Sequence, residues 1–281
     1  MDTWVDWTII NFDPLFRSIN AGVLALLVPL EKFLMGEPLY RGWPQWLSMP
    51  WWLVIAVTVY IAWRTSGRNI AILTTVLFLL MAILGLFDFA MQTLAITFTA
   101  TLIAIAIGLP LGIFGAKSDR MDAISRPILD AMQTMPSFVY LVPAIMLFGL
   151  GKTPAVMATV IYAIPPLIRL TNLGIRQVDK EVVEAAIAFG STSRQLLTKV
   201  QLPMAKPTIM AGINQCIMMA LAMVVICSMI GAKGLGIEVM NGIARLEVGR
   251  GFLGGLGIVM MAIMIDRITQ SVGKSRESQV T

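Results

Sequence analysis

The sequence predicts an all-α polytopic membrane protein. Hydrophobic residues make up 57% of the 281 positions, charged residues only 13%, and the mean hydropathy is +0.81. A water-soluble domain has nearer half of its residues apolar and about a quarter charged. The apolar residues also gather in runs that approach the ~20 residues needed for a spanning helix, separated by short polar loops. Most of the chain is therefore expected to lie in a lipid bilayer.

The first fifty residues have a different pattern. From position 4 to 34, aromatic and aliphatic residues recur with charged ones among them, which is typical of an amphipathic helix at the membrane interface. The first residues, MDTWVDW, are acidic where a signal peptide would be basic, so we expect no cleaved leader. We therefore predict an interfacial, extracytoplasmic segment over 1–50.

About seven spanning helices follow. Two accessory helices occupy 51–90, a five-helix core occupies 91–270, and 271–281 form a cytoplasmic tail. The stretch 51–63 is short alone but reaches the length needed to cross the hydrocarbon layer with its aromatic flanks. The predicted spans are 51–63, 70–87, 91–116, 128–150, 154–173, 208–230 and 252–265.

The lysine and arginine residues predict the orientation. They are spread singly beside apolar runs, so the net charge of +5 is a topology signal rather than a nucleic-acid-binding patch. Short cytoplasmic loops carry an excess of positive charge in membrane proteins. An outside N-terminus and a cytoplasmic C-terminus place most of the basic residues inside, and leave Lys152, Lys233, Arg245 and Arg250 outside.

The longest polar interruption is 179–207, where local signals predict two short helices joined by a turn. Asp179 can cap the first helix, because its carboxylate accepts hydrogen bonds from the free N–H groups of the first turn. Gly190 stands where a left-handed C-terminal cap is needed. The first helix is therefore expected to end just before this glycine.

The second helix of this loop has its own signals. Thr192 and Gln195 have the spacing of a capping box, which opens a helix. We expect Pro203 to stop that helix, and Pro207 to stand in the first turn of the next span. A polar helix–turn–helix on the cytoplasmic side predicts a surface that is held by something outside the membrane.

Seven residues of this loop have a recognisable spacing: Glu184, Ala185, Ala186, Gly190, Val200, Leu202 and Pro203. The spacing resembles the EAA loop of the membrane subunits of ABC importers, with valine at 200 where the family usually has isoleucine. In that family the loop forms a coupling helix that docks in a cleft of the ATPase subunit. The resemblance therefore assigns these residues to ATPase coupling; an amphipathic loop lying on the membrane surface is the alternative.

A wider resemblance covers roughly 91–270. The segments 129–151, 164–178, 199–215 and 266–270 are similar to the permease of the glycine betaine/proline betaine/choline branch of these importers. The resemblance implies the type I importer fold and a permease homodimer in a bacterial inner membrane. It also implies two copies of a separate ATPase and an extracytoplasmic substrate-binding protein. The implied substrate is a quaternary ammonium compatible solute, and the implied role is osmoprotection.

The chain itself is expected to be non-catalytic. It contains no Walker A pattern, so ATP and Mg²⁺ would bind to the partner ATPase. Histidine is absent, and the two cysteines, Cys216 and Cys227, are too far apart along one apolar run to bond each other. We therefore expect no metal site or disulfide in this chain.

Several ionisable and aromatic side chains within the predicted spans are candidates for a role in transport. Asp130, Arg169 and Asp266 lie within or at the ends of spans, where an ionisable group needs a partner. We expect Asp130 to pair with an arginine rather than to contact substrate. Phe138 and Tyr140 either gate a pore or pack in the core. No substrate site is assigned.

Small and kinking residues in the spans also have two interpretations. Gly108 with Gly112, and Gly251 with Gly255, have the spacing that permits close helix contact, and packing within one subunit is favoured over a dimer interface. The prolines either kink helices that line the pathway or only shape packing. These prolines are Pro110, Pro136, Pro143, Pro165 and Pro166.

The sequence disfavours two other classes of function. An ion-coupled secondary transporter of small osmolytes would bury carboxylates at mid-membrane, and only Asp130 comes close. An intramembrane enzyme would need paired aspartates or an activated nucleophile in the spans, and none is visible. The loop at 179–207 favours the importer permease, in which ATP-driven closure of the ATPase pair switches the spans between outward and inward access.

Overall fold

The computed structural model describes residues 2–36 and 51–274. Within that part of the chain every regular element is helical. The helices are α1 (Asp2–Met35), α2 (Trp51–Ser66), α3 (Arg68–Ile83), α4 (Phe87–Lys117), α5 (Asp119–Thr134), η2 (Ser137–Tyr140), α6 (Leu141–Phe148), α7 (Lys152–Arg176), α8 (Lys180–Ala188), α9 (Ser193–Gln195), η3 (Leu196–Gln201), α10 (Leu202–Cys227), η4 (Ser228–Ile230), α11 (Leu235–Ala244) and α12 (Val248–Lys274). The all-α prediction is confirmed.

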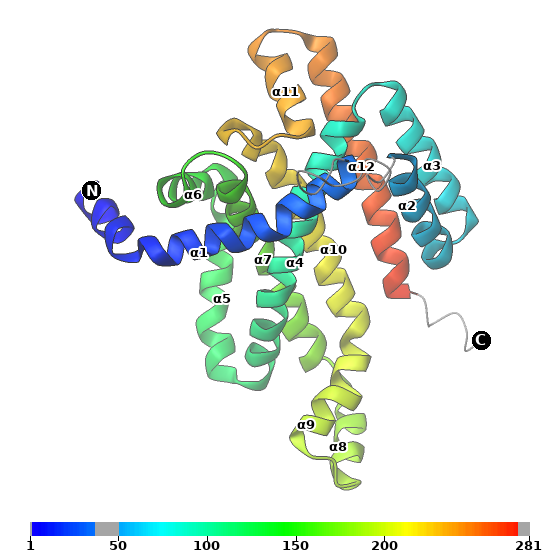
Figure 1. Ribbon diagram of the computed structural model, residues 1–281. Coiled ribbons are helices and arrows are strands. Elements are labelled where there is room, and N and C mark those ends of the chain that lie inside the picture. The colour runs from blue at the N-terminus through cyan, green and yellow to red at the C-terminus, as the bar shows by residue number, and fades with distance from the viewer. Residues whose placement is uncertain (1, 37–50, 275–281) are drawn as a thin grey trace.

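The centre of the molecule is built from α4, α7 and α10, which pack side by side with α12 beside α10 (Figure 1). The contact between α4 and α7 is close because glycines face it. A Cβ atom on Gly112 would lie 2.6 Å from Thr171 Cβ, and one on Gly108 would lie 2.9 Å from Leu167 Cδ2. The small-residue spacing at these two glycines therefore serves packing within one chain, as expected.

The predicted span 128–150 is wrong as a single helix. The chain breaks between α5 and α6, and the two parts are bent by 108°. The break lies at Pro136, and the preceding residue, Met135, has an extended backbone (φ −68°, ψ 134°). Proline disfavours the helical conformation in the residue before it, so the sequence itself contains the reason for the break.

Within residues 2–36 and 51–274, five helical segments are long and apolar enough to cross a membrane, or six if the bent pair counts as one. The predicted spans 51–63 and 70–87 correspond to α2 and α3, which have 16 residues each. Sixteen helical residues cover about 24 Å, less than the ~30 Å hydrocarbon layer. In contrast, residues 11–35, which were predicted to be interfacial, pass the same length test.

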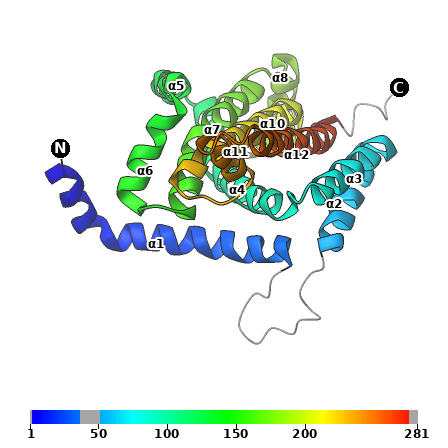
Figure 2. The same ribbon diagram turned by 90° about the horizontal axis from the view of Figure 1, so that it is seen from above.

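The N-terminal helix α1 runs crosswise to α4, α7 and α10 (Figure 1) and passes along one side of them (Figure 2). Two polar contacts tie it to the start of α7: Lys152 pairs with Glu31, and Thr153 bonds to Asn20. This crosswise course suits the predicted interfacial placement, which stays a prediction. The rest of the predicted N-terminal segment, 37–50, lies outside the described residues, as do 275–281 of the tail.

The hairpin of α11 and the first turns of α12 was not predicted. Its two helices touch at glycines, since a Cβ atom on Gly242 would lie 2.3 Å from the backbone nitrogen of Gly251. Arg250 also donates two hydrogen bonds to the Glu238 carboxylate, from Nε at 2.7 Å and from Nη2 at 3.0 Å. The hairpin projects at the end of the molecule opposite α8 and α9 (Figure 1).

Candidate functional site

The first helix of the polar loop 179–207, α8, begins as predicted. The Asp179 carboxylate accepts a hydrogen bond from the backbone N–H of Glu181 at 2.9 Å, which caps the helix. The Glu181 carboxylate lies in the first turn, where its negative charge interacts favourably with the positive end of the helix dipole. These local contacts fix where α8 starts without help from the rest of the molecule.

The end of α8 is also confirmed. Gly190 has a left-handed backbone (φ +81°), and its N–H donates to the Ile187 carbonyl at 2.8 Å. The N–H of Ser191 donates to the Ala186 carbonyl at 3.1 Å, so the chain reverses within a few residues. No atom lies within 4 Å of the place where a Cβ on Gly190 would stand. Glycine is therefore needed here for its backbone conformation and not for space.

The predicted capping box is present at the start of α9. The Thr192 hydroxyl accepts from the backbone N–H of Gln195 at 3.4 Å, and the Gln195 side chain accepts from the backbone N–H of Thr192 at 2.9 Å. Two free N–H groups of the helix start are thus satisfied reciprocally. The turn between α8 and α9 therefore has a defined shape.

The prediction that Pro203 stops the second helix is wrong. The segment Leu196–Gln201 is a π-helix that runs directly into α10, with Pro203 in its first turn and Pro207 inside it. A proline ring normally clashes with the carbonyl four residues earlier. For Pro203 that carbonyl belongs to Lys199, which lies in the wider π-helical turn. The loop is therefore continuous with a core helix.

A small hydrophobic cluster joins the loop to the body. Its buried members come from the end of α7, the π-helix and the start of α10: Ile175, Val178, Leu197, Ala205 and Ile209. Val183 of α8 and Leu202 pack against it from the side. One face of α8 is thus held by packing, although none of its residues is buried.

The other face of α8 is open. Its apolar side chains Val182 and Ile187 are exposed, and Phe189, directly after the helix, is 91% exposed. Glu184 lies beside a cavity of about 220 Å³ that Lys180 and Arg176 also line. Exposed apolar side chains next to a fixed charge are suited to docking on another protein. Sequence analysis missed Phe189, although an aromatic residue before a capping glycine in a polar loop was a usable signal.

The seven sequence-predicted loop residues do not form one surface. Glu184, Ala185 and Gly190 are exposed on the α8 side, and Ala186 is half-buried. Val200 and Leu202 are half-buried against the body, and Pro203 is exposed at the start of α10. The structure thus divides the motif into an exposed part and a part that connects the loop to a core helix.

The three ionisable candidates of the spans, Asp130, Arg169 and Asp266, have partners. Asp130 pairs with Arg169, as expected, and Asp266 accepts hydrogen bonds from Asn214 at 3.0 Å and from Gln270. Of the two aromatic candidates, Tyr140 is buried and donates to the Met132 carbonyl. Phe138 is exposed. Tyr140 therefore packs in the core.

No group of three or more histidine, cysteine, aspartate or glutamate side chains that could hold a metal ion is found in the described residues. Cys216 and Cys227 are both buried and both free. Cys227 lies beside Thr159, and its thiol donates to the Ala155 carbonyl at 3.6 Å. Both cysteines thus contribute to core packing.

Comparison with known proteins identifies the family. Residues 108–275, which include the whole loop 179–207, match the family described as the inner membrane component of binding-protein-dependent transport systems. The chain belongs to this family. It is therefore a multi-pass membrane component of a transport system.

The chain is similar to several transport permeases, and the similarity extends over most of their length. The chain is 47% identical to the Escherichia coli glycine betaine/proline betaine permease ProW, covering 99% of this chain and 77% of that one. It is 45% identical to the Bacillus subtilis glycine betaine permease OpuAB, covering 99% and 95%. It is 51% identical to the Listeria monocytogenes glycine betaine/carnitine permease GbuB, covering 84% and 86%.

A solved structure supports the fold. The methionine ABC transporter MetNI in an inward-facing conformation superposes with a TM-score of 0.63 at 20% identity, covering 68% of this chain and 95% of that one. At this identity the likeness concerns the fold alone. The predicted type I importer fold is confirmed.

Proposed function

We propose that this chain is the membrane-spanning permease of an ATP-driven importer for a quaternary ammonium compatible solute. A second copy of the chain, two copies of an ABC ATPase and an extracytoplasmic solute-binding protein would complete the importer. The observation that carries the proposal is the cytoplasmic loop, whose capped, half-exposed α8 presents Phe189 and Glu184 to a partner. ATP and Mg²⁺ would bind only to the ATPase, and this chain would carry out no chemistry.

The coupling residues in this proposal are those of the loop. The ATPase would contact Glu184, Ala185, Ala186 and Gly190, because α8 has small side chains there and ends in a turn of defined shape. Val200, Leu202 and Pro203 would carry the movement into α10, because the π-helix makes loop and span continuous. Closure of the ATPase pair would then shift α7 and α10 against α4 and alternate access to the pathway.

The same arrangement supports an orientation with the loop in the cytoplasm. The loop with Lys180, Arg194 and Lys199 lies at one end of the molecule, and the α11–α12 hairpin lies at the other (Figure 1). The bias of lysine and arginine toward the cytoplasm places the loop end inside. The hairpin, where the guanidinium of Arg250 is offset by two glutamates, would then face outward.

The solute class rests on the relatives. Three permeases at 45–51% identity are named for glycine betaine, with proline betaine or carnitine named for individual ones. Glycine betaine, proline betaine and choline all carry a quaternary ammonium group, which favours aromatic faces. The binding protein would supply that recognition, and the permease would transmit the solute.

An ion-coupled secondary transporter is the competing function. It would require a carboxylate in the spans that is free to take up and release an ion. The buried carboxylates of the described residues are each paired: Glu31 with Lys152, Asp122 with Arg126 and Glu238 with Arg250. This pairing disfavours the secondary transporter.

The proposal is tested with the permease, its ATPase and its binding protein reconstituted in liposomes. We expect ATP-dependent uptake of one quaternary ammonium solute from a panel, and none without the binding protein. Glu184→Lys and Gly190→Trp should abolish uptake while the permease remains inserted. Asp13→Lys, a charge reversal at a partly exposed side chain of α1 that pairs with Arg17, serves as the control and should transport normally. Uptake driven by an ion gradient without ATP would refute the proposal.

A further inference from the structure

We infer that Arg176 is a positioning residue that passes the movement of α8 to the ends of α4 and α5. The inference rests on the proposed function and adds a second coupling element, which lies outside the EAA spacing. Arg176 stands in the last turn of α7, and only residues 177–179 separate it from the start of α8. Its position thus links the loop to the body.

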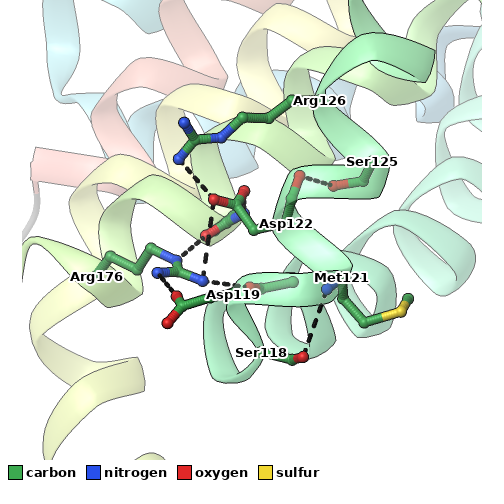
Figure 3. Close-up of polar contacts among 9 residues, drawn as sticks. Ser118, Asp119, Met121, Asp122, Ser125, Arg126 and Arg176 are labelled. Atoms are coloured by element: carbon green, nitrogen blue, oxygen red, sulfur yellow. Dashed lines mark hydrogen bonds and ion pairs between the residues drawn. The ribbon is translucent and has the colours of Figure 1, made fainter.

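The guanidinium of Arg176 contacts three helices (Figure 3). It donates to the Gly115 carbonyl of α4 at 2.8 Å and to the Asp119 carboxylate of α5 at 2.6 Å. Its Nε donates to the Asn172 side chain of its own helix at 2.8 Å. Arginine suits this position because its planar fork offers five donors in fixed directions.

The contact with Gly115 is the one that reaches α4. The last four carbonyls of a helix have no partner within the helix, and a cation favours the negative end of the helix dipole. Gly115 lies in the last turn of α4, which ends at Lys117. A Cβ atom on Gly115 would lie 3.1 Å from the Asn172 amide nitrogen, so the glycine also leaves room for this network.

These contacts continue into a more buried set of hydrogen bonds between α5 and α7. Asn172 donates to Asp122 at 2.6 Å, and Asp122 pairs with Arg126 at 2.5 Å. The Asp122 side chain is 9% exposed, whereas the Asp119 side chain is 94% exposed. An exposed ion pair contributes little free energy, but a buried hydrogen-bonded charge does not tolerate loss of its partner. The Asp122 side of the network therefore holds α5 to α7.

The connection from α8 to Arg176 is short and packed. Val178 is buried in the small hydrophobic cluster, and Asp179 caps α8. Arg176 lines two cavities, one of about 220 Å³ next to Glu184 and one of about 300 Å³ between α5 and α7. A shift of α8 would thus pull on Arg176 directly, and the neighbouring cavities give the side chain space to move.

The structure contains a matched control on the same two helices. Arg169 of α7 pairs with Asp130 of α5, about two turns away from Arg176, and both side chains are exposed. Among the contacts of the described residues, this pair has no bond to α4. If Arg176 acts only as a surface ion pair between α5 and α7, the two arginines are equivalent.

The test compares Arg176→Gln with Arg169→Gln in the reconstituted importer, and measures ATP hydrolysed per solute imported. We expect Arg176→Gln to raise this ratio about tenfold, because bonds from a charged donor are lost, and Arg169→Gln to leave it unchanged. The ratio for Arg176→Lys should lie between those of the unmodified importer and Arg176→Gln, since an ammonium group lacks the planar fork needed for all three contacts. Asp119→Asn should have the smallest effect of the variants within the Arg176 network, because that carboxylate is exposed and Arg176 also lies 4.0 Å from the Asp122 carboxylate of α5.

Thermal unfolding shows whether the variants fold. If Arg176→Gln is unstable, Arg176→Lys makes the same test, because lysine keeps the charge but lacks the fork that makes several contacts at once. An equal ratio in Arg176→Gln and Arg169→Gln, or parallel loss of hydrolysis and uptake, would overturn the inference. If the unmodified importer shows no uptake dependent on the binding protein and ATP, the proposed function fails instead.

Discussion

The polar loop 179–207 and the interface between α4 and α7 use glycine for different purposes. In the loop, Gly190 has a left-handed backbone and open space around it. In the interface, Gly112 is inside a regular helix, and the backbone oxygen of Ile168 lies 2.9 Å from where its Cβ would be. The loop needs glycine for a conformation, whereas the interface needs it for distance.

This difference shows which part of the molecule is free to bind a partner. The loop obtains its shape from hydrogen bonds between neighbours in the sequence. The side chains on its outer face are therefore not needed to stabilise the fold of this chain. The α4–α7 interface obtains its shape from contacts between residues more than fifty positions apart, such as Gly112 with Thr171. Changes in the loop should therefore alter function, and changes in the interface should alter stability.

The largest effect is expected at the interface. Gly112→Ala should lower the free energy of unfolding by about 1–3 kcal/mol, because the added methyl group meets Thr171 and a backbone carbonyl. Gly255→Ala is the matched variant, since nothing lies within 4 Å of its Cβ position, and it should stabilise by roughly 0.5–1 kcal/mol. Thermal unfolding in detergent measures both. Equal shifts for the two variants would contradict the steric role.

A smaller effect is expected at the turn of the loop. Gly190→Ala should cost about 1–2 kcal/mol locally, because an L-residue is strained at this φ. Gly190→Asn should cost less, since asparagine tolerates the left-handed region. Hydrogen exchange of 180–195 and the affinity for the ATPase report the change, while the unfolding temperature should stay constant. If alanine and asparagine behave alike, the backbone argument is wrong.

The smallest effect is expected at the capping box. Thr192→Ala should destabilise the start of α9 by about 1 kcal/mol, because the Gln195 N–H loses its acceptor. Thr192→Ser keeps a hydroxyl and should be nearly neutral. Faster amide exchange at Gln195 in the alanine variant alone would support the assignment. Exchange that is unchanged in both variants would show that the π-helix holds this end by itself.

Sequence reasoning succeeded where signals are local. The cap at Asp179, the turn at Gly190 and the box at Thr192 were all predicted, because each depends on residues within four positions of one another. It failed at Pro203, where a π-helix takes up the proline. It also gave too much weight to hydrophobicity at 128–150, although Pro136 signals a break there.

The partner of Asp130 was predicted as an arginine without naming which one, because pairing across helices depends on their packing. Arg176 was not singled out for the same reason. Its three bonds join residues from Gly115 to Asn172, and no spacing in the sequence brings these together. The hairpin of α11 was missed because its short apolar helix is held by contacts with α12 rather than by its own pattern.

The sequence by itself determined the all-α membrane class and the local shape of the polar loop 179–207. The hydrophobicity of a run determines whether it transfers to lipid, and a cap depends on hydrogen bonds between sequence neighbours. Both are therefore properties of short stretches of chain. Only the tertiary structure decided that the loop is continuous with α10, that α5 and α6 bend apart, and that Arg176 meets α4. These features depend on which distant backbones come close, and that is set by packing of the whole bundle.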